Sequence, residues 1–299
     1  MAKEKQKYEK LQAVAPDRHR LQGFSEKPEN KENVKLVPAV EKAIRIITLI
    51  NQAQKSLSLA EIAQELEITK SHCHGLLKTL TYFDWLRFDP ATKTYRLHTG
   101  MIRDYSAILR ERTSPTQIRP QLEAFCEAVQ VSCVLSEPLS DATFLVLDNV
   151  SASTDIEISY PTGYRLPQDA PAHMRAFLAW HQDHEIDEYL ANLSFKKYTR
   201  HSVTDPVALR EELARTRERG YARSKDEFVE GIMAMALPIF DQEGKVMYIF
   251  DCVGRTEAIL PREEVISAQL IRSVDTLHRL FASLPPPTFP HPNMRRHRP

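Results

Sequence analysis

Polar and basic residues between positions 69 and 80 gather on one side of a predicted helix. On a wheel of about 100° per residue, the core stripe is formed by Cys73, Leu76, Leu77 and Leu80. The opposite side and its shoulder carry Ser71, His74, Gly75 and Lys78. Serine and histidine can hydrogen-bond bases or phosphates, lysine suits a phosphate, and glycine allows close approach of the backbone. This face is therefore predicted to enter the major groove of duplex DNA.

A basic hairpin is predicted immediately after this helix. The segment WLRFDPATKTYRL alternates apolar and polar residues on both sides of DPATK, as two paired strands do. Its basic residues are Arg87 and Arg96 on the strands and Lys93 at the tip. Such a hairpin can hold backbone phosphates as the wing of a winged helix does.

Two other interpretations of these residues stay open. Every amphipathic helix has a polar outer face, so Ser71 and Lys78 are also compatible with plain solvation. A winged helix can serve as a protein-interaction module as well. A metal site at His72, Cys73 and His74 is not expected, because neighbours one or two positions apart on a helix point to different sides.

The elements that position this face can be placed along residues 36–98. A first helix is indicated by the stripe Val40, Ala43, Ile44, Ile47 and Ile50. Ser58 and Glu61 have the spacing of a capping box at the start of a second helix, and a third starts near Thr69. Three short helices followed by a hairpin predict a winged helix-turn-helix.

A linker helix is predicted over residues 99–113. Its apolar stripe consists of Met101, Tyr105, Ile108 and Leu109. We consider this stripe a candidate for part of a dimer contact, and packing within one chain is the open alternative.

Composition bounds the classes of protein that this chain can form. It has 299 residues, a formal net charge of zero and four widely spaced cysteines. No apolar run approaches the roughly 18 residues that span a bilayer, so we expect a cytoplasmic protein with reduced thiols and no membrane contact. Because the net charge is zero, any attraction to DNA must come from a local group of basic residues. Disorder is expected in the Lys/Glu/Gln-rich arm 1–35 and in the proline-rich tail 285–299.

Residues 114–284 are expected to form one α/β domain. Strand-like runs, VSCVLSEPL, ATFLVLDNV, GIMAMALPIF and KVMYIFDCV, alternate with helices at QLEAFCEAVQ, AHMRAFLAW, VALREELARTRERG and 261–284. An enzyme acting on a small organic molecule is the alternative function for this domain. The sequence has no glycine-rich phosphate loop and no H-E-x-x-H or G-x-S-x-G string, and Cys252 lies in an apolar strand. We therefore expect no catalytic residue, cofactor or metal.

From about Val37 to Leu284, the chain resembles the IclR-type bacterial transcription regulators. The resemblance rests on the order of VPAVEKAIRII, LSLAEIAQEL, ITKSHCHGLLKTL, YRLP, AHMRAFLA, VTDP, LREELARTRERGYARSKDE and GIMAMALPIFDQEGKV. It implies an α+β protein: an N-terminal winged helix-turn-helix, a linker helix and a C-terminal α/β, GAF-like, effector-binding domain. It further implies a homodimer or tetramer on a duplex DNA operator. A repressor of a catabolic operon, controlled by an aromatic or other catabolic intermediate, is the expected function.

The chain departs from the family pattern at several places. Gly75 stands where the family usually has arginine, and Met174 and Arg175 replace a Gly-Lys pair. Ala234 replaces a typical cysteine, and Asp251 takes one of two sheet positions that often carry serine, Val253 the other.

The resemblance also implies an effector pocket on one face of the sheet. Its predicted residues are Ile158, Arg165, Ala172, His173, Ser224, Ile232, Ala234, Asp251 and Val253. An exposed Asp251 outside the pocket and a purely structural His173 are the open alternatives. We expect a ligand with an apolar body and a hydrogen-bond donor, such as a phenol or alcohol, directed at Asp251. Any carboxylate on it is expected to face Arg165 or His173.

Overall fold

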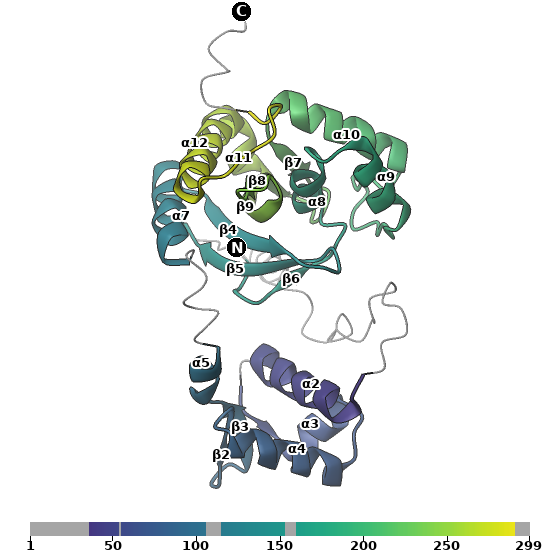
Figure 1. Ribbon diagram of the computed structural model, residues 1–299, viewed down its shortest axis with the longest axis vertical. Coiled ribbons are helices and arrows are strands. Elements are labelled where there is room, and N and C mark those ends of the chain that lie inside the picture. Colours follow the sequence, from purple (N-terminus) through teal and green to yellow (C-terminus); the bar gives the residue numbers. More distant parts are fainter. Residues whose placement is uncertain (1–35, 54, 106–114, 153–159, 291–299) are drawn as a thin grey trace, which may run out of the picture. The chain divides into compact units, whose positions relative to one another are not determined.

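The computed structural model describes residues 36–53, 55–105, 115–152 and 160–290, and they fall into two compact units (Figure 1). The first unit lies within residues 36–105 and the second within 115–290. Each has its own buried apolar core. The sequence therefore predicted the existence of two domains, and each is described by itself below.

Helices and one small sheet build the N-terminal unit. Its elements are α2 (Pro38–Ala53), β1 (Leu57–Ser58), α3 (Leu59–Glu65), α4 (Lys70–Tyr82), β2 (Leu86–Asp89), β3 (Thr94–Leu97) and α5 (Gly100–Asp104). The strands form an antiparallel sheet in the order β1-β3-β2. This is a winged helix-turn-helix, and its short strand β1 was not predicted from the sequence.

Local caps fix where two of these helices begin. Ser58 Oγ accepts a hydrogen bond from the Glu61 amide at 3.3 Å, and a Glu61 carboxylate oxygen accepts one from the Ser58 amide at 2.7 Å. The predicted capping box of α3 is thus present. Thr69 caps α4 in the same way, because its hydroxyl accepts from the His72 amide at 3.3 Å.

The core face of α2 differs from the predicted stripe. Ile46, Leu49 and Ile50 are buried, whereas Val40 and Ile44 are 56% and 58% exposed. The helix carries more apolar side chains than one core-facing side can cover, so periodicity alone did not select the buried ones. The predicted core of α4 is closer to the structure: Cys73, Leu77 and Leu80 are buried and Leu76 is half-buried.

Of the predicted linker helix, the structure describes only the short α5 and Tyr105. Ile108 and Leu109 lie outside the described residues. Met101 is half-buried and Tyr105 is exposed. The Trp85 indole donates to the Asp104 carboxylate at 2.7 Å, which ties α5 to the start of β2.

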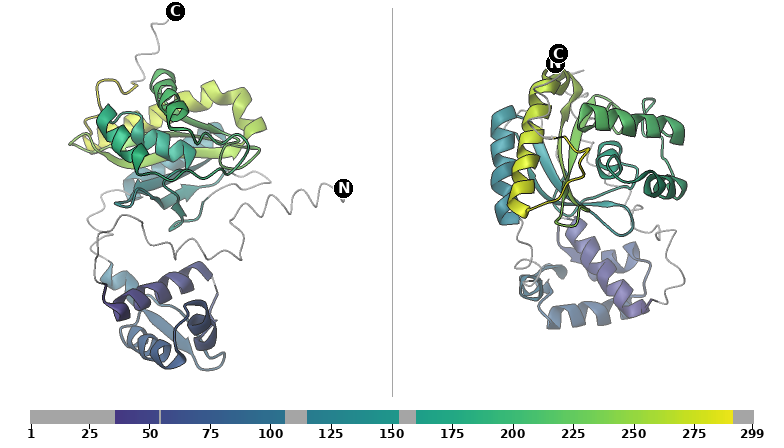
Figure 2. Two further views of the ribbon diagram at one scale, coloured as in Figure 1. Left: turned by 90° about the vertical axis from the view of Figure 1, so that its right-hand side faces the viewer. Right: turned by 45° about the horizontal axis from the view of Figure 1, so that its top comes forward.

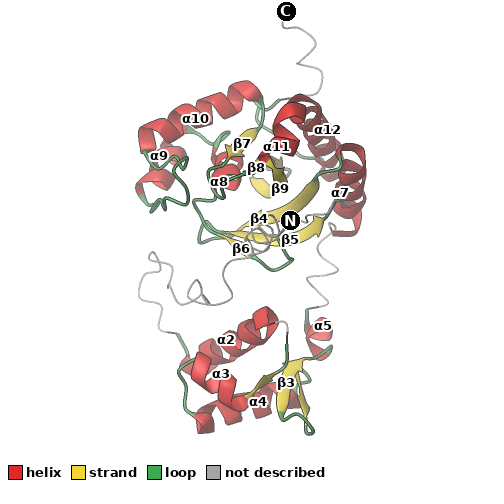
Figure 3. Ribbon diagram, turned by 180° about the vertical axis from the view of Figure 1, so that it is seen from behind, coloured by secondary structure: helices red, strands yellow, loops and turns green. Residues whose placement is uncertain are grey.

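A curled antiparallel sheet forms the centre of the C-terminal unit (Figure 3). Its strands, in the order β6-β5-β4-β9-β8-β7, are β6 (Arg165–Leu166), β5 (Phe144–Val150), β4 (Ser132–Pro138), β9 (Val246–Arg255), β8 (Ile232–Phe240) and β7 (Ala222–Lys225). The helices are α7 (Pro115–Val129), α8 (Pro171–Leu178), α9 (Asp183–Ala191), α10 (Pro206–Arg219), α11 (Thr256–Ile259), the 3-10 turn η2 (Leu260–Arg262) and α12 (Glu263–Phe281).

The two faces of this sheet meet different helices. Helices α7 and α12 lie side by side over one face, and α8 packs on the other (Figures 1 and 2). Because side chains alternate along a strand, Cys252 points into the core with α7 and α12, and Asp251 points to the α8 side. The register continues this arrangement, with Asp251 opposite both Val134 and Ala236.

One expectation for the C-terminal unit is wrong, and one of its helices was not predicted. The segment 285–290 was expected to be disordered, yet Phe289 is only 2% exposed and packs against Trp180, Phe240 and His278. The domain therefore extends to at least residue 290, and residues 291–299 lie outside the described residues. Helix α9 was not predicted. Gly220 ends α10 in the left-handed conformation, as predicted (φ 85°).

Candidate functional site

The four polar positions predicted on α4 share one exposed face. Ser71, His74, Gly75 and Lys78 are all exposed, while Cys73 on the other side is fully buried. The Thr69 cap fixes where the helix starts, and the packing of its apolar stripe fixes its rotation. The arrangement presents hydrogen-bonding groups and one ammonium group on a convex helix that fits a major groove.

Gly75 is unusual on this face because nothing in the folded domain requires a glycine there. A Cβ atom built at this position meets no other atom within 4 Å. The local hydrogen bond, from the Thr79 hydroxyl to the Gly75 carbonyl at 3.0 Å, involves the backbone only. A side chain at position 75 would therefore extend outwards from the helix without contacting the rest of the domain.

The β2–β3 hairpin brings two of its basic residues together. Arg87 and Arg96 are direct cross-strand partners, and both are exposed. Like charges directly opposite each other destabilise a sheet slightly, and a phosphate between them would remove that repulsion. Lys93 lies at the turn, exposed and with a positive φ of 53°. The hairpin thus offers three cations to a phosphate backbone.

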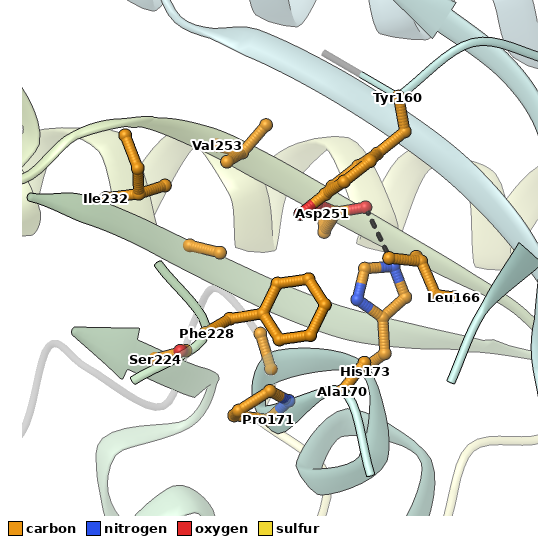
Figure 4. Close-up of a pocket in the computed structure, with 12 residues that line it drawn as sticks. Tyr160, Leu166, Ala170, Pro171, His173, Ser224, Phe228, Ile232, Asp251 and Val253 are labelled. Atoms are coloured by element: carbon orange, nitrogen blue, oxygen red, sulfur yellow. Dashed lines mark ion pairs between the residues drawn. The ribbon is translucent and has the colours of Figure 1, made fainter. Parts of the chain in front are cut away.

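A cavity lies between α8 and the sheet in the C-terminal unit (Figure 4). Seven predicted positions line it: Ala172, His173, Ser224, Ile232, Ala234, Asp251 and Val253. Five further lining residues were not predicted: Tyr160, Leu166, Ala170, Pro171 and Phe228. Leu166 lies within YRLP and Pro171 directly precedes AHMRAFLA, so their place in the sequence was a usable signal. Tyr160 and Phe228 lie in loops, which carry no periodicity to predict their direction.

The polar end of this cavity is formed by Asp251 and His173. Nε2 of His173 lies 3.2 Å from a carboxylate oxygen of Asp251, and the two side chains are 5% and 1% exposed. The contact lacks the geometry of a hydrogen bond, and among the described residues neither carboxylate oxygen nor Nε2 has a hydrogen-bond partner. The Tyr160 ring points toward this pair (Figure 4). Burial, and secondarily the nearby Asp251 charge, raises the pKa of Tyr160.

Arg165, a predicted effector-binding residue, is not placed in the lining of the cavity. Its guanidinium forms an ion pair with Asp141 and donates to the Thr143 hydroxyl at 2.8 Å. Thr143 and Asp141 come from the turn that precedes β5, which pairs with β6. Ile158 lies outside the described residues.

A second arginine near α8 is also neutralised. Arg175 is 1% exposed and forms paired hydrogen bonds to the two carboxylate oxygens of Glu227, at 2.7 and 2.5 Å. The same guanidinium donates to the Arg223 carbonyl at 2.5 Å. Arg175 therefore joins α8 to the segment after β7, and Glu227 neutralises its charge.

No group of three or more His, Cys, Asp or Glu side chains in the described parts of the chain is placed to hold a metal ion. Cys252 is fully buried on the face opposite the cavity, and burial raises the pKa of its thiol, so the thiolate that nucleophilic attack requires is disfavoured. No helix in those parts is both long and apolar enough to cross a membrane.

A winged helix with a basic wing, joined to a domain with a partly polar cavity, defines a ligand-responsive DNA-binding regulator. Comparison with known proteins gives the family. The IclR helix-turn-helix domain model matches residues 39–90, and the bacterial transcriptional regulator IclR C-terminal model matches residues 108–277. The chain belongs to the IclR family of transcriptional regulators.

Individual relatives agree with this assignment. The HTH-type transcriptional regulator BhcR of Paracoccus denitrificans is 30% identical over 209 residues, which cover 70% of this chain and 74% of BhcR. An IclR transcriptional regulator structure from Alicyclobacillus acidocaldarius is 27% identical with a TM-score of 0.72, covering 82% and 98% of the two chains. An IclR homologue from Microbacterium hydrocarbonoxydans, solved with 4-hydroxybenzoate, is 21% identical with a TM-score of 0.67, covering 81% and 99%.

Proposed function

We propose that this regulator binds a duplex operator through the exposed face of α4 and the β2–β3 hairpin. The observation that carries the proposal is the convergence of Ser71, His74 and Lys78 on one exposed face of a helix-turn-helix, followed by the Arg87–Arg96 pair. The whole chain has no net charge, so attraction to DNA comes from this local cluster. Lys78 and the wing contact phosphates, and Ser71 and His74 contact base edges.

Control by a small organic effector in the cavity is the second part of the proposal. Ligand sites are concave, mostly apolar and contain a few convergent polar groups, which fits the apolar walls around Asp251 and His173. The structure of the Microbacterium homologue with 4-hydroxybenzoate supports a small organic effector. Repression of a catabolic operon is the proposed outcome, because occupying an operator is enough to block a promoter, whereas activation needs an additional contact with the polymerase.

A salt series tests the DNA assignment at Lys78. Removing one phosphate contact should weaken binding to all sequences and reduce the slope of log K against log salt by about 1. Fluorescence anisotropy with a duplex from the region upstream of the gene measures both. Lys245→Ala is the matched control, since Lys245 is an exposed lysine of the C-terminal unit that pairs with Glu243. Full affinity and an unchanged slope for Lys78→Ala would exclude Lys78 from the interface.

A further inference from the structure

Asp251 and His173 contact each other at 3.2 Å in the cavity, and no other described residue pairs with their buried polar atoms. Both carboxylate oxygens and Nε2 are fully shielded from solvent and accept or donate no hydrogen bond there. Buried polar groups in folded proteins are nearly always paired, and an unpaired one is costly to retain. The pair therefore indicates that a ligand completes this hydrogen-bonding group.

The charges around the cavity decide which ligand can do so. Among the described residues that line it, none is a lysine or an arginine. The two nearby arginines are used elsewhere, Arg165 by Asp141 and Arg175 by Glu227. The remaining group that can become cationic is His173, whose charge would be offset by Asp251 only 3.2 Å away. A carboxylate placed here would meet a second carboxylate without a free cation.

The shape of the cavity adds a further restriction. Apolar side chains form most of its wall, among them Leu166, Phe228, Ile232 and Val253. The cavity volume of about 30 Å³ admits a polar group of about the size of water. A larger ligand must turn a side chain such as Tyr160 or Phe228 aside, so part of its binding free energy is spent on reorganisation.

We infer that this cavity selects small organic ligands whose head group donates hydrogen bonds, a hydroxyl or an ammonium on an apolar body, and disfavours carboxylates. The inference rests on the cavity being the effector site proposed above. Asp251 accepts the donor, and His173 orients the carboxylate through its other oxygen. This selectivity is a property of the Asp251–His173 pair in this chain.

Three probes of the same ring and one-carbon head group test the inference: benzyl alcohol, benzylamine and benzoate. Calorimetry and thermal unfolding of the full-length protein, with millimolar probe, give the order of affinity. At least one donor should bind about tenfold or more tightly than benzoate, which corresponds to about 1.4 kcal/mol. Asp251→Asn keeps the shape and removes the charge. It should weaken the donor by about tenfold and strengthen benzoate, since His173 is then released to pair with it.

Matched variants make the result specific. Asp183→Asn is the same substitution at an exposed position of α9 outside the cavity, and it should leave all three affinities unchanged. His173→Gln should leave benzoate weak even when combined with Asp251→Asn. If Asp251→Asn does not fold, Asp251→Ser takes its place, and the order of probes on the wild type is already decisive.

The inference is overturned if benzoate binds the wild type as tightly as both donors, if Asp251→Asn leaves the order unchanged, or if no probe binds. Operator binding by the unliganded wild type is measured in parallel. Its loss would contradict the proposed function, whereas intact operator binding with the wrong order of probes would contradict only the ligand class.

Discussion

At the scale of single residues, one wall of the cavity is built from alternate positions of β8 and β9. Asp251, Val253 and Ala234 were placed correctly on the cavity because alternation along strands fixes the face on which a side chain lies. Arg165 was misplaced because its partner, Asp141, lies on the turn before a neighbouring strand, and sequence spacing does not reveal which carboxylate an arginine selects. His173 was predicted as a cavity residue. Its 3.2 Å contact with Asp251 depends on how α8 packs on the sheet, which sequence spacing does not reveal.

Gly75 is a residue whose cost to stability can be measured separately from its function. Glycine inside a helix is destabilising by roughly 0.5–1 kcal/mol relative to alanine, and a Cβ here meets nothing within 4 Å. We expect Gly75→Ala to raise the free energy of unfolding by that amount and to weaken operator binding, since the added methyl group faces the DNA. Denaturant unfolding and anisotropy check the two effects.

Gly100 provides the opposite control in the same domain. A Cβ at Gly100 would collide with the backbone carbonyl and Cβ of Asp84. Gly100→Ala should therefore destabilise the domain, in contrast to Gly75→Ala. A destabilised Gly75→Ala protein would show that α4 needs this glycine for folding, contrary to the interpretation of Gly75 as a position open to the partner.

At the scale of elements, the sequence indicates helices best where their ends have chemical signals. The Ser58–Glu61 box and Gly220 were predicted and are present. The short β1 and β6 have two residues each, too few for a periodic pattern, and neither strand was predicted. Helix α9 was missed because its polar residues outnumber its two buried ones, Ile186 and Leu190.

The capping box of α3 predicts a defined loss of stability. Ser58→Ala should lower the free energy of unfolding of the N-terminal domain by about 1 kcal/mol, because the Glu61 amide loses its acceptor. Thr204→Ala, a substitution outside this domain, is the control for the same transition. An unchanged midpoint in denaturant would show that the cap contributes nothing to this domain.

The same box gives a pH dependence whose sign can be stated. The hydrogen bond from the Ser58 amide lowers the pKa of Glu61 in the folded protein. A carboxyl with a lowered folded pKa stabilises the protein above its unfolded pKa, near 4.3, and this stabilisation is lost as pH falls through the folded value. The difference in stability between wild type and Glu61→Gln should therefore shrink below about pH 4. A difference that grows on acidification would contradict the assignment.

The segment after α12 acts as a structural element although it has no regular secondary structure. Phe289 is buried against Trp180, Phe240 and His278. Phe289→Ala should destabilise the C-terminal domain by about 3 kcal/mol or more, through lost burial and the cavity that remains. Leu284→Ala is the control from the same segment, since Leu284 is 64% exposed. Equal effects of the two variants in thermal unfolding would argue against a buried role for Phe289.

At the scale of the whole molecule, effector and operator are coupled only if the effector has different affinities for two states of the protein. Linkage then requires reciprocity: a ligand that weakens operator binding by a given factor is itself bound more weakly, by the same factor, in the operator complex. Each domain has its own buried core, so the two states must differ in more than the packing of a single shared core.

Assembly is the property of the whole molecule that most affects DNA recognition. One winged helix reads a short half-site, and two copies on a symmetric operator read twice that length. We therefore expect a mass of at least twice 34.4 kDa in light scattering at micromolar concentration.

Ile102 of α5 is 60% exposed beside Met101 and Tyr105 of the predicted dimer stripe. Ile102→Glu should therefore shift the protein toward monomer and weaken operator binding at the same time. Val207→Glu, at a 66% exposed position of α10, controls for adding a charge to an exposed apolar site. A 34.4 kDa particle for the wild type would exclude the dimer, and an unchanged mass for Ile102→Glu would move the contact away from α5.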